Sequence, residues 1–347
     1  MKKQLIFEKK AYHFALLAFV LFTLLFSGCG GGSASSGSNA GNAAAADGGT
    51  EKTYYDVKLA DVTSTTLTVL YLADDLGYFE EFGVNPVWVG TVASGQQVAS
   101  VLSGDLNVGG GHANRLIAGI ASGAKLKAVV AASETTEAIP HMKFLALEDS
   151  GLNTAEDVLG KKIGIATVGG CNEYTTYEYL KKELGIEDPR ELINYVILPA
   201  GTEETALRNG DVDIIGLHGD PVEVINRGGV KVLYTDYEVW GGDGGATPYY
   251  FSTEFIEKNP EAVHGFVSAV AKAGNWLNEN PEEAQKLFAE RVGLDPKEVL
   301  YFYYSPDGII RPETIDIWNG ILLEYGEIKE SVPLEQVYTN EFNDLAK

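Results

Sequence analysis

The middle of the chain repeats one pattern of alternating strands and helices, and this repeat constrains the fold more than any other feature. The segment VLSGDLNV at 101–108 closely matches LRNGDVDI at 207–214, and the elements predicted around each segment occur in the same order. Strands that alternate with helices through short loops form parallel sheets with helices on their faces. Two such units in tandem therefore predict two similar α/β lobes.

Hydrophobic periodicity and turn residues predict the elements of both units. In the first unit they are strands at 57–62, 86–90 and 106–110 and helices at 67–82 and 94–102. In the second they are strands at 162–168, 195–198 and 212–216 and helices at 174–184 and 202–209. Near the C-terminus, Pro260 and Pro281 each begin a helix, because proline is favoured in the first turn. These helices are expected to cover the first lobe.

The first 29 residues have the pattern of an export signal. Four lysines among the first ten residues precede an uncharged apolar run at 15–26, and Ser27 and Gly28 separate this run from Cys29. A cationic start, a short apolar run and a small-residue exit predict a signal peptide rather than a membrane-spanning helix.

The end of this signal resembles the lipobox of bacterial lipoproteins, although Phe26 stands where that family usually has Leu. The resemblance implies that residues 1–28 are removed and that Cys29 carries acyl chains such as palmitate. The protein would then be anchored to the cell membrane, facing the extracytoplasmic side. An ordinary cleaved signal and an uncleaved anchor are the alternatives. Residues 29–51, rich in Gly, Ser and Ala, are expected to form a flexible linker to a folded domain at 52–347.

The charge and the cysteine count exclude two classes of protein. The chain has 26 Lys and Arg against 49 Asp and Glu, a formal net charge of −23. Such acidity argues against binding to nucleic acid or to anionic lipid through a basic patch. The only cysteine besides Cys29 is Cys171, so an intrachain disulfide framework is not expected.

The repeat also predicts where a ligand binds. In open α/β sheets, ligands bind at the carboxyl ends of the strands, where loops and helix N-termini converge, and two lobes bring two such edges together. Free backbone N–H groups at helix starts could hold an anion there, although capping is the simpler role for each Ser or Asn. The predicted ligand-binding residues are Thr63, Ser64, Thr65, Ser94, Gly95, Gln96, His112, Asn114, Gly170, Cys171, Asn172, Glu173, Thr202, His218, Asp220, Trp240 and Tyr249.

Several short motifs follow one another in an order found in a known family. They are LGYFEEFGV at 76–84, LSGD at 102–105, ASGA at 121–124, EDVLGKKIG at 156–164 and GDVD at 210–213. Together they resemble the nitrate/sulfonate/taurine and thiamine-precursor group of substrate-binding proteins of ABC importers, from about residue 57 to about residue 325. The resemblance implies a two-lobed, periplasmic-binding-protein-like type II fold. Each lobe would be a mainly parallel sheet flanked by helices, with the ligand cleft between the lobes.

The resemblance also implies a role and a division of the chain. Lobe 1 would comprise residues 52–140 and 246–347, and lobe 2 residues 141–245. A monomeric protein of this group closes its lobes around a small solute and delivers it to a membrane permease and its ATPase. No cofactor is implied.

The charged and aromatic candidates favour a solute that carries a nitrogen donor. Glu173 and Asp220 would repel an anion unless they are paired, whereas they suit an amine or a ring N–H. Arg115, one turn into its predicted helix, is the only basic candidate beside these loops. Trp240 and Tyr249 could stack on a flat or cationic ligand, or pack at the hinge. An aminosulfonate or a nitrogen heterocycle is therefore favoured over a simple inorganic anion.

A metal receptor and a secreted hydrolase are the two alternative classes of protein. A metal receptor could use His112, Cys171, Glu173 and His218, although their spacing is not diagnostic. A secreted hydrolase would require a GxSxG or HExxH motif, and the sequence contains neither. The sequence therefore predicts a binding protein rather than an enzyme, without a bound metal.

Overall fold

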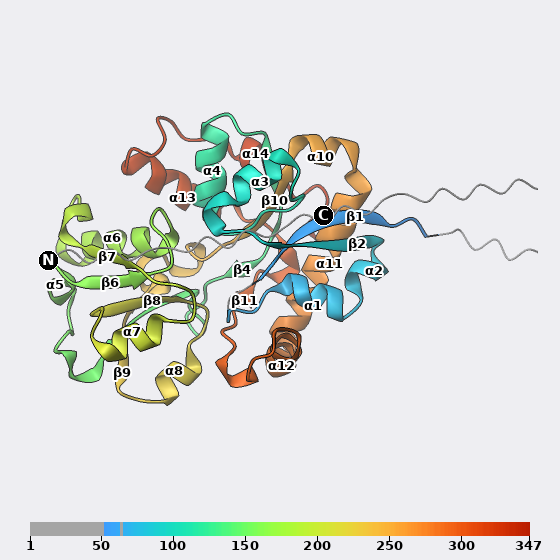
Figure 1. The fold of residues 1–347 in the computed structure, drawn as a ribbon. Coiled ribbons are helices and arrows are strands. Elements are labelled where there is room, and N and C mark those ends of the chain that lie inside the picture. Colours follow the sequence, from blue (N-terminus) through green and yellow to red (C-terminus); the bar gives the residue numbers. More distant parts are fainter. Residues whose placement is uncertain (1–51, 63–64) are drawn as a thin grey trace, which may run out of the picture. The chain divides into compact units, whose positions relative to one another are not determined.

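The computed structural model describes residues 52–62 and 65–347, and the strands of these residues form four sheets (Figure 1). The predicted signal peptide and linker, with Cys29, and the predicted site residues Thr63 and Ser64 lie outside the described residues. The strands are β1 Tyr55–Asp61, β2 Val84–Thr91, β3 Leu126–Ala131, β4 Ser133–Glu134, β5 Met142–Leu147, β6 Lys162–Ile165, β7 Asn194–Ile197, β8 Ile214–His218, β9 Val230–Thr235, β10 Pro248–Ser252 and β11 Tyr303–Tyr304.

The helices connect and cover these sheets. They are α1 Val69–Asp75, α2 Tyr78–Glu81, α3 Gln97–Ser103, α4 Ala113–Ala121, α5 Ala155–Val158, α6 Cys171–Leu184, α7 Glu203–Asn209, α8 Val222–Asn226, α9 Asp236–Trp240, α10 Thr253–Lys258, α11 Pro260–Glu279, α12 Pro281–Val292, α13 Pro312–Glu324 and α14 Leu334–Val337. In the part of the chain that the structure describes, no helix combines the length and the apolar character needed to cross a membrane.

The second lobe is built on a five-stranded sheet in the order β7-β6-β8-β5-β9. Four of its strands run in one direction, and β5 runs antiparallel to its neighbours β8 and β9. Successive residues of a strand point to opposite faces. Phe144 therefore packs in the core under α6, while Leu145 packs with Leu207 of α7 on the other face. Both faces are covered by helices, as the alternating pattern predicts.

The first lobe combines strands from both ends of the chain. β1 pairs parallel with β2, whereas β10 pairs antiparallel with β3 and β11 with β4. The long helix α11 lies across these strands and buries Val263, Phe266, Val267, Val270 and Leu277. This burial confirms the prediction that the C-terminal helices cover the first lobe.

Two predicted elements differ in the structure. The helix expected over 67–82 is divided into α1 and α2, because Gly77 has a left-handed φ of 73° that an α-helix cannot contain. The strand expected over 106–110 is absent. The amides of Asn107 and Val108 both donate to the Lys58 carbonyl instead of forming a regular ladder, and only Gly109 forms a β-bridge, to Tyr250.

Candidate functional site

Three of the five histidines of the chain lie together, on elements of both lobes. His112 immediately precedes α4 of the first lobe, His141 immediately precedes β5, and His218 is the last residue of β8. β5 and β8 are adjacent strands, and their register places Met142 opposite His218. One ring nitrogen of each histidine lies within 4.8 Å of one ring nitrogen of each of the other two. Elements distant in sequence thus converge on a single imidazole cluster.

A thiol and two aromatic rings complete the surroundings of this cluster. Cys171, the first residue of α6, places its Sγ 2.8 Å from Nε2 of His218. The His141 ring stacks on Phe302 with a centroid distance of 4.3 Å, and the Trp318 ring packs edge-on with the His112 ring at a centroid distance of 5.4 Å. The rings hold the imidazoles in place, and they keep this side of the cluster apolar.

Hydrogen bonds orient the ring of His141. Its Nδ1 lies 3.2 Å from Oγ of Ser133, which in turn lies 2.6 Å from Oγ1 of Thr247. The Thr247 hydroxyl also accepts the Ser133 backbone N–H. His141 is only 2 % exposed, and its Nε2 has no hydrogen-bond partner among the described residues. The same holds for Nε2 of His112. Two imidazole nitrogens in the cluster are therefore buried and unpaired.

Burial decides the protonation of these four side chains. Desolvation, followed by repulsion from neighbouring imidazoles and, for His112 alone, from Arg115, holds the pKa values of His112 and His141 well below the usual 6.5. The same causes, desolvation and then Arg115, lower the pKa of His218 to about 4. Burial raises the pKa of the Cys171 thiol to about 12. At neutral pH the cluster thus holds neutral imidazoles and a protonated thiol.

A pocket of about 260 Å³ lies between α4 and the start of α6. Its polar lining includes Asn114, Arg115, Glu173 and Glu327, and Tyr174 supplies an aromatic wall. The side-chain amide of Asn114 donates to the Gly169 carbonyl at 3.0 Å, which links the two lobes at the edge of the pocket. Arg115 lines this pocket, which its position one turn into a helix did not indicate.

Both predicted site carboxylates have protein partners. Glu173 accepts the Gly169 backbone N–H at 2.5 Å and the Tyr177 hydroxyl at 2.7 Å. Asp220 forms an ion pair with Lys143 at 2.5 Å, and both side chains are nearly buried. The Lys143 ammonium offsets the charge of Asp220, whereas the partners of Glu173 are neutral donors that leave its negative charge in place.

The remaining predicted residues occupy several different places. Thr65 lies before α1, and Ser94, Gly95 and Gln96 form an exposed turn before α3. Gly170 precedes α6, and Asn172 is buried in its first turn. Thr202 is exposed and donates to the Pro199 carbonyl. Trp240 packs against Trp318, and Tyr249 packs edge-on against Phe266. Of the described predicted residues, Asn114 and Glu173 line the pocket, while His112, Cys171 and His218 belong to the cluster.

Sequence reasoning missed His141 and Trp318. His141 lies in the segment that crosses between the lobes, and no helix or strand pattern marks it as a site residue. The available signal was the rarity of histidine in this chain, which has only five. Trp318 is fully buried in α13 and was indistinguishable in sequence from a core residue.

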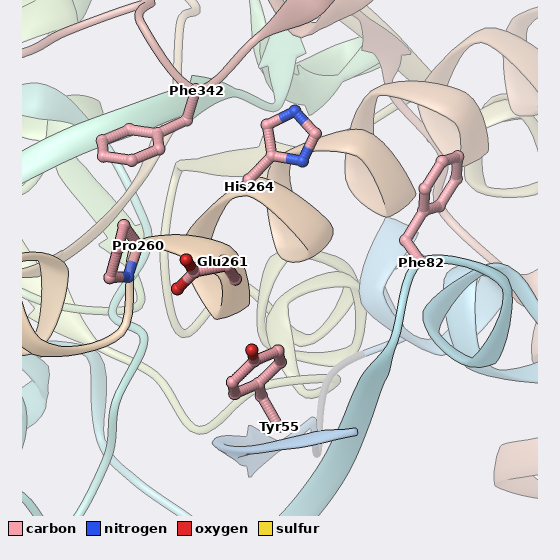
Figure 2. Close-up of a pocket in the computed structure, with 6 residues that line it drawn as sticks. All are labelled: Tyr55, Phe82, Pro260, Glu261, His264 and Phe342. Atoms are coloured by element: carbon pink, nitrogen blue, oxygen red, sulfur yellow. The ribbon is translucent and has the colours of Figure 1, made fainter. Parts of the chain in front are cut away.

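Another pocket lies on the first lobe (Figure 2). It has a volume of about 480 Å³ and is lined by Tyr55, Phe82, Pro260, Glu261, His264 and Phe342. Its lining contains no residue predicted from the sequence to bind ligand. The convergence of polar groups from both lobes makes the region around α4 and α6 the better candidate for function.

Two lobes with a polar site between them are the architecture of the type II periplasmic-binding-protein fold. A family model described as NMT1/THI5 like matches residues 64–284, and the chain therefore belongs to this family. Alkanesulfonate-binding and nitrate-binding proteins share its fold. These matches confirm the family resemblance read from the short motifs. A comparison with curated protein sequences found no match.

Three solved structures illustrate the range of the fold. The alkanesulfonate-binding protein SsuA from Xanthomonas axonopodis pv. citri has a TM-score of 0.64 at 18 % identity, over 82 % of this chain and 98 % of its own. A ligand-binding component of an ABC-type import system from Staphylococcus aureus, with zinc bound, has a TM-score of 0.67 at 12 % identity, over 84 % and 99 %. The desulfurization enzyme DSZB has a TM-score of 0.59 at 16 % identity, over 84 % and 98 %. At these sequence identities, each similarity shows a shared fold and nothing further.

Proposed function

We propose that the chain is the solute-binding protein of an ABC importer, anchored outside the cytoplasm through a lipid on Cys29. It captures a small solute by lobe closure and delivers it to a permease and its ATPase. The observation that carries this proposal is the convergence of polar side chains from both lobes in a protein of the NMT1/THI5-like family. A ligand that contacts both lobes favours the closed state, because only in that state can both lobes contact the ligand at once.

The pocket between α4 and α6 is the proposed place of the solute. Arg115 and the Asn114 amide offer donors to an oxyanion, and a guanidinium suits such a group well. Asp220 is ion-paired with Lys143, and the oxygens of Glu173 already accept two hydrogen bonds, so both carboxylates are less available to an amine. A sulfonate or taurine-like solute is therefore proposed ahead of a neutral heterocycle. The sulfonate named for the Xanthomonas protein supports this order.

A receptor is proposed rather than an enzyme, although DSZB shows that the fold can carry an enzyme. The contact between Cys171 and His218 has the composition of a nucleophilic dyad. However, burial raises the pKa of the thiol to about 12, while that of His218 falls to about 4. The proton therefore stays on sulfur, and a neutral thiol is a poor nucleophile.

Thermal unfolding against a solute library tests this proposal. Residues 52–347, which belong to a single compact unit, are mixed with alkanesulfonates, taurine, nitrate, pyrimidines, amino acids and divalent metals. Metals are included because of the zinc named for the Staphylococcus protein. A ligand at 100 times its dissociation constant stabilises the fold by about 2.7 kcal/mol. The expected result is a clear rise in melting temperature with one class of organic or oxyanion solute, without turnover of that solute.

Substitution at Arg115 locates the solute. Arg115→Gln should abolish most of the shift produced by a sulfonate, because it removes the cation that lines the pocket. Arg190→Gln is the matched control, since Arg190 is exposed and paired with Asp188. An equal shift in both variants would show that the solute does not bind in this pocket. Conversion of the solute to a product would show that the protein is an enzyme rather than a receptor.

A further inference from the structure

We propose that His112, His141, His218 and Cys171 form a binding site for a divalent transition-metal ion of the zinc class. Three imidazole nitrogens and one sulfur are a ligand set that zinc accepts in a tetrahedral site. Imidazole and thiolate ligands favour zinc and related borderline metals over calcium or magnesium, which prefer oxygen. The site goes beyond the proposed function, because it does not depend on which solute the pocket holds.

The distances are close to those that a metal requires. Zinc–nitrogen bonds of 2.0–2.1 Å place the ligand atoms of a tetrahedral site about 3.3 Å apart. The imidazole nitrogens already lie within 4.8 Å of one another, and Sγ of Cys171 lies 2.8 Å from Nε2 of His218. Side-chain rotations would therefore draw the imidazoles inward and separate the sulfur from His218.

Unpaired nitrogens indicate that the cluster is more than packing. Buried polar atoms in proteins are nearly always hydrogen-bonded, yet Nε2 of His112 and Nε2 of His141 have no partner among the described residues. An ion between them would satisfy both. With Nδ1 of His141 donating to Ser133, its Nε2 carries the lone pair that a metal needs. A metal-ligating histidine usually donates its other ring N–H to an acceptor that fixes its tautomer and orientation, and the Ser133 hydroxyl is placed to do so here.

Metal binding would release one proton. The Cys171 thiol loses its proton to solvent as the sulfur–metal bond forms, because the thiolate is the form that coordinates. The thiolate would also offset the repulsion between the ion and the nearby Arg115, whose charge acts on both His218 and Cys171. The imidazoles are neutral at pH 7 and need not lose a proton.

The ligands come from both lobes, so an ion should favour the closed arrangement. His112 belongs to the first lobe, whereas Cys171 and His218 belong to the second. His141 lies at the crossing between them. Only the closed state brings all four ligands to one point, and an ion that binds this state better shifts the population toward it.

Titration of the full chain with Co²⁺ tests the site, because Co²⁺ can replace zinc at such sites and absorbs visible light. After treatment with chelator, we expect one Co²⁺ per chain, a sulfur-to-cobalt charge-transfer band, and displacement by Zn²⁺. His141→Gln should raise the half-saturating Co²⁺ concentration more than 100-fold. Ser133→Ala, which removes only the group that orients His141, should raise it about 10- to 100-fold. The matched control is His264→Gln, because His264 lies outside the cluster and contacts Asp344.

Cys171→Ser tests the contribution of the sulfur separately from that of the histidines. This variant should still bind Co²⁺ through the histidines but should lose the charge-transfer band. The absence of saturable Co²⁺ and Zn²⁺ binding would overturn the proposal, as would equal affinities of the His141→Gln and His264→Gln variants. If His141→Gln fails to fold by circular dichroism, the Cys171→Ser spectrum decides, and a band that persists overturns the assignment. Failure here leaves the solute receptor standing, since its test relies on Arg115.

Discussion

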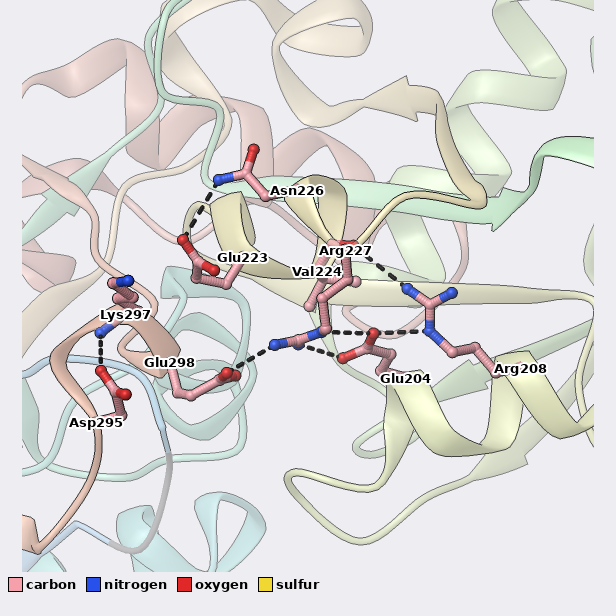
Figure 3. Close-up of polar contacts among 9 residues, drawn as sticks. All are labelled: Glu204, Arg208, Glu223, Val224, Asn226, Arg227, Asp295, Lys297 and Glu298. Atoms are coloured by element: carbon pink, nitrogen blue, oxygen red, sulfur yellow. Dashed lines mark hydrogen bonds and ion pairs between the residues drawn. The ribbon is translucent and has the colours of Figure 1, made fainter.

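Nη1 of Arg227 lies 2.6 Å from Oε1 of Glu298, and this ion pair joins the second lobe to the segment that follows α12 of the first (Figure 3). Arg227 also contacts Glu204, which pairs with Arg208 four residues along α7. The second lobe thus holds the guanidinium in place from its own side. The two partners that cross between the lobes are 39 % and 46 % exposed, so solvent screens their attraction.

Arg227→Gln should shift the lobes toward the open arrangement without unfolding either. An exposed pair contributes less than about 1 kcal/mol, which corresponds to at most about a fivefold change in the ratio of closed to open molecules. Small-angle X-ray scattering should show a larger radius of gyration in the variant. Lys258→Gln is the control, because it removes an exposed ion pair within α10 alone. Equal radii in the two variants would show that the Arg227 contact does not hold the lobes.

Asp236→Asn should stabilise the protein at alkaline pH. Asp236 is fully buried, Oδ1 accepts N–H and O–H donors from Met142 and Thr135, and desolvation raises its pKa from 3.8 to about 6. Because the folded pKa lies above the unfolded one, this contribution to stability is present below pH 4 and is lost as pH rises through 6.

The uncharged amide avoids this loss, so we expect Asp236→Asn to gain about 1–3 kcal/mol at pH 8 and little at pH 4. Denaturant unfolding of wild type and variant at both pH values measures the difference. Asp316→Asn, at an exposed position of α13, should change little at either pH. The same gain at pH 4 and pH 8 would mean that the charge of Asp236 is not its cause.

Gly109→Ala should destabilise the first lobe. A Cβ at this position would lie 2.3 Å from Cζ of Tyr250, whose ring is buried, and Gly109 exchanges two backbone hydrogen bonds with Tyr250. Overpacking of this kind costs about 1–3 kcal/mol. Gly320→Ala is the contrasting case, because Gly320 is an exposed position of α13 with open space around it, and the variant should gain up to about 1 kcal/mol. Melting temperatures that move in the same direction would contradict this argument.

Cys29→Ser should release the protein from membranes. The proposed lipid requires the thiol of Cys29, and a serine cannot carry a thioether-linked anchor. Cell fractionation followed by immunodetection compares the variant with wild type, and Cys171→Ser is the control, since it changes the other cysteine of the chain. Continued retention of the Cys29→Ser variant in the membrane fraction would favour an uncleaved helical anchor.

Local signals in the sequence predicted most of the elements of the fold. The helix at 174–184 became α6, beginning three residues earlier at Cys171, and Pro260 and Pro281 begin α11 and α12 as expected. Hydrophobic periodicity and capping residues act within a few positions, so a single sequence reveals them. The antiparallel insertion of β5 between β8 and β9 left no such signal, because strand pairing joins residues far apart in the chain.

The amino-acid sequence by itself determined the alternating α/β pattern, the two similar units and the family motifs that run through them. Only the tertiary structure decided which polar residues meet. His112, His141 and His218 belong to three separate segments, and nothing in their spacing places three imidazoles within 4.8 Å of one another. Periodicity reports which face of an element is buried. Convergence on a site depends on how the elements pack against one another, and that is set by contacts across the whole fold.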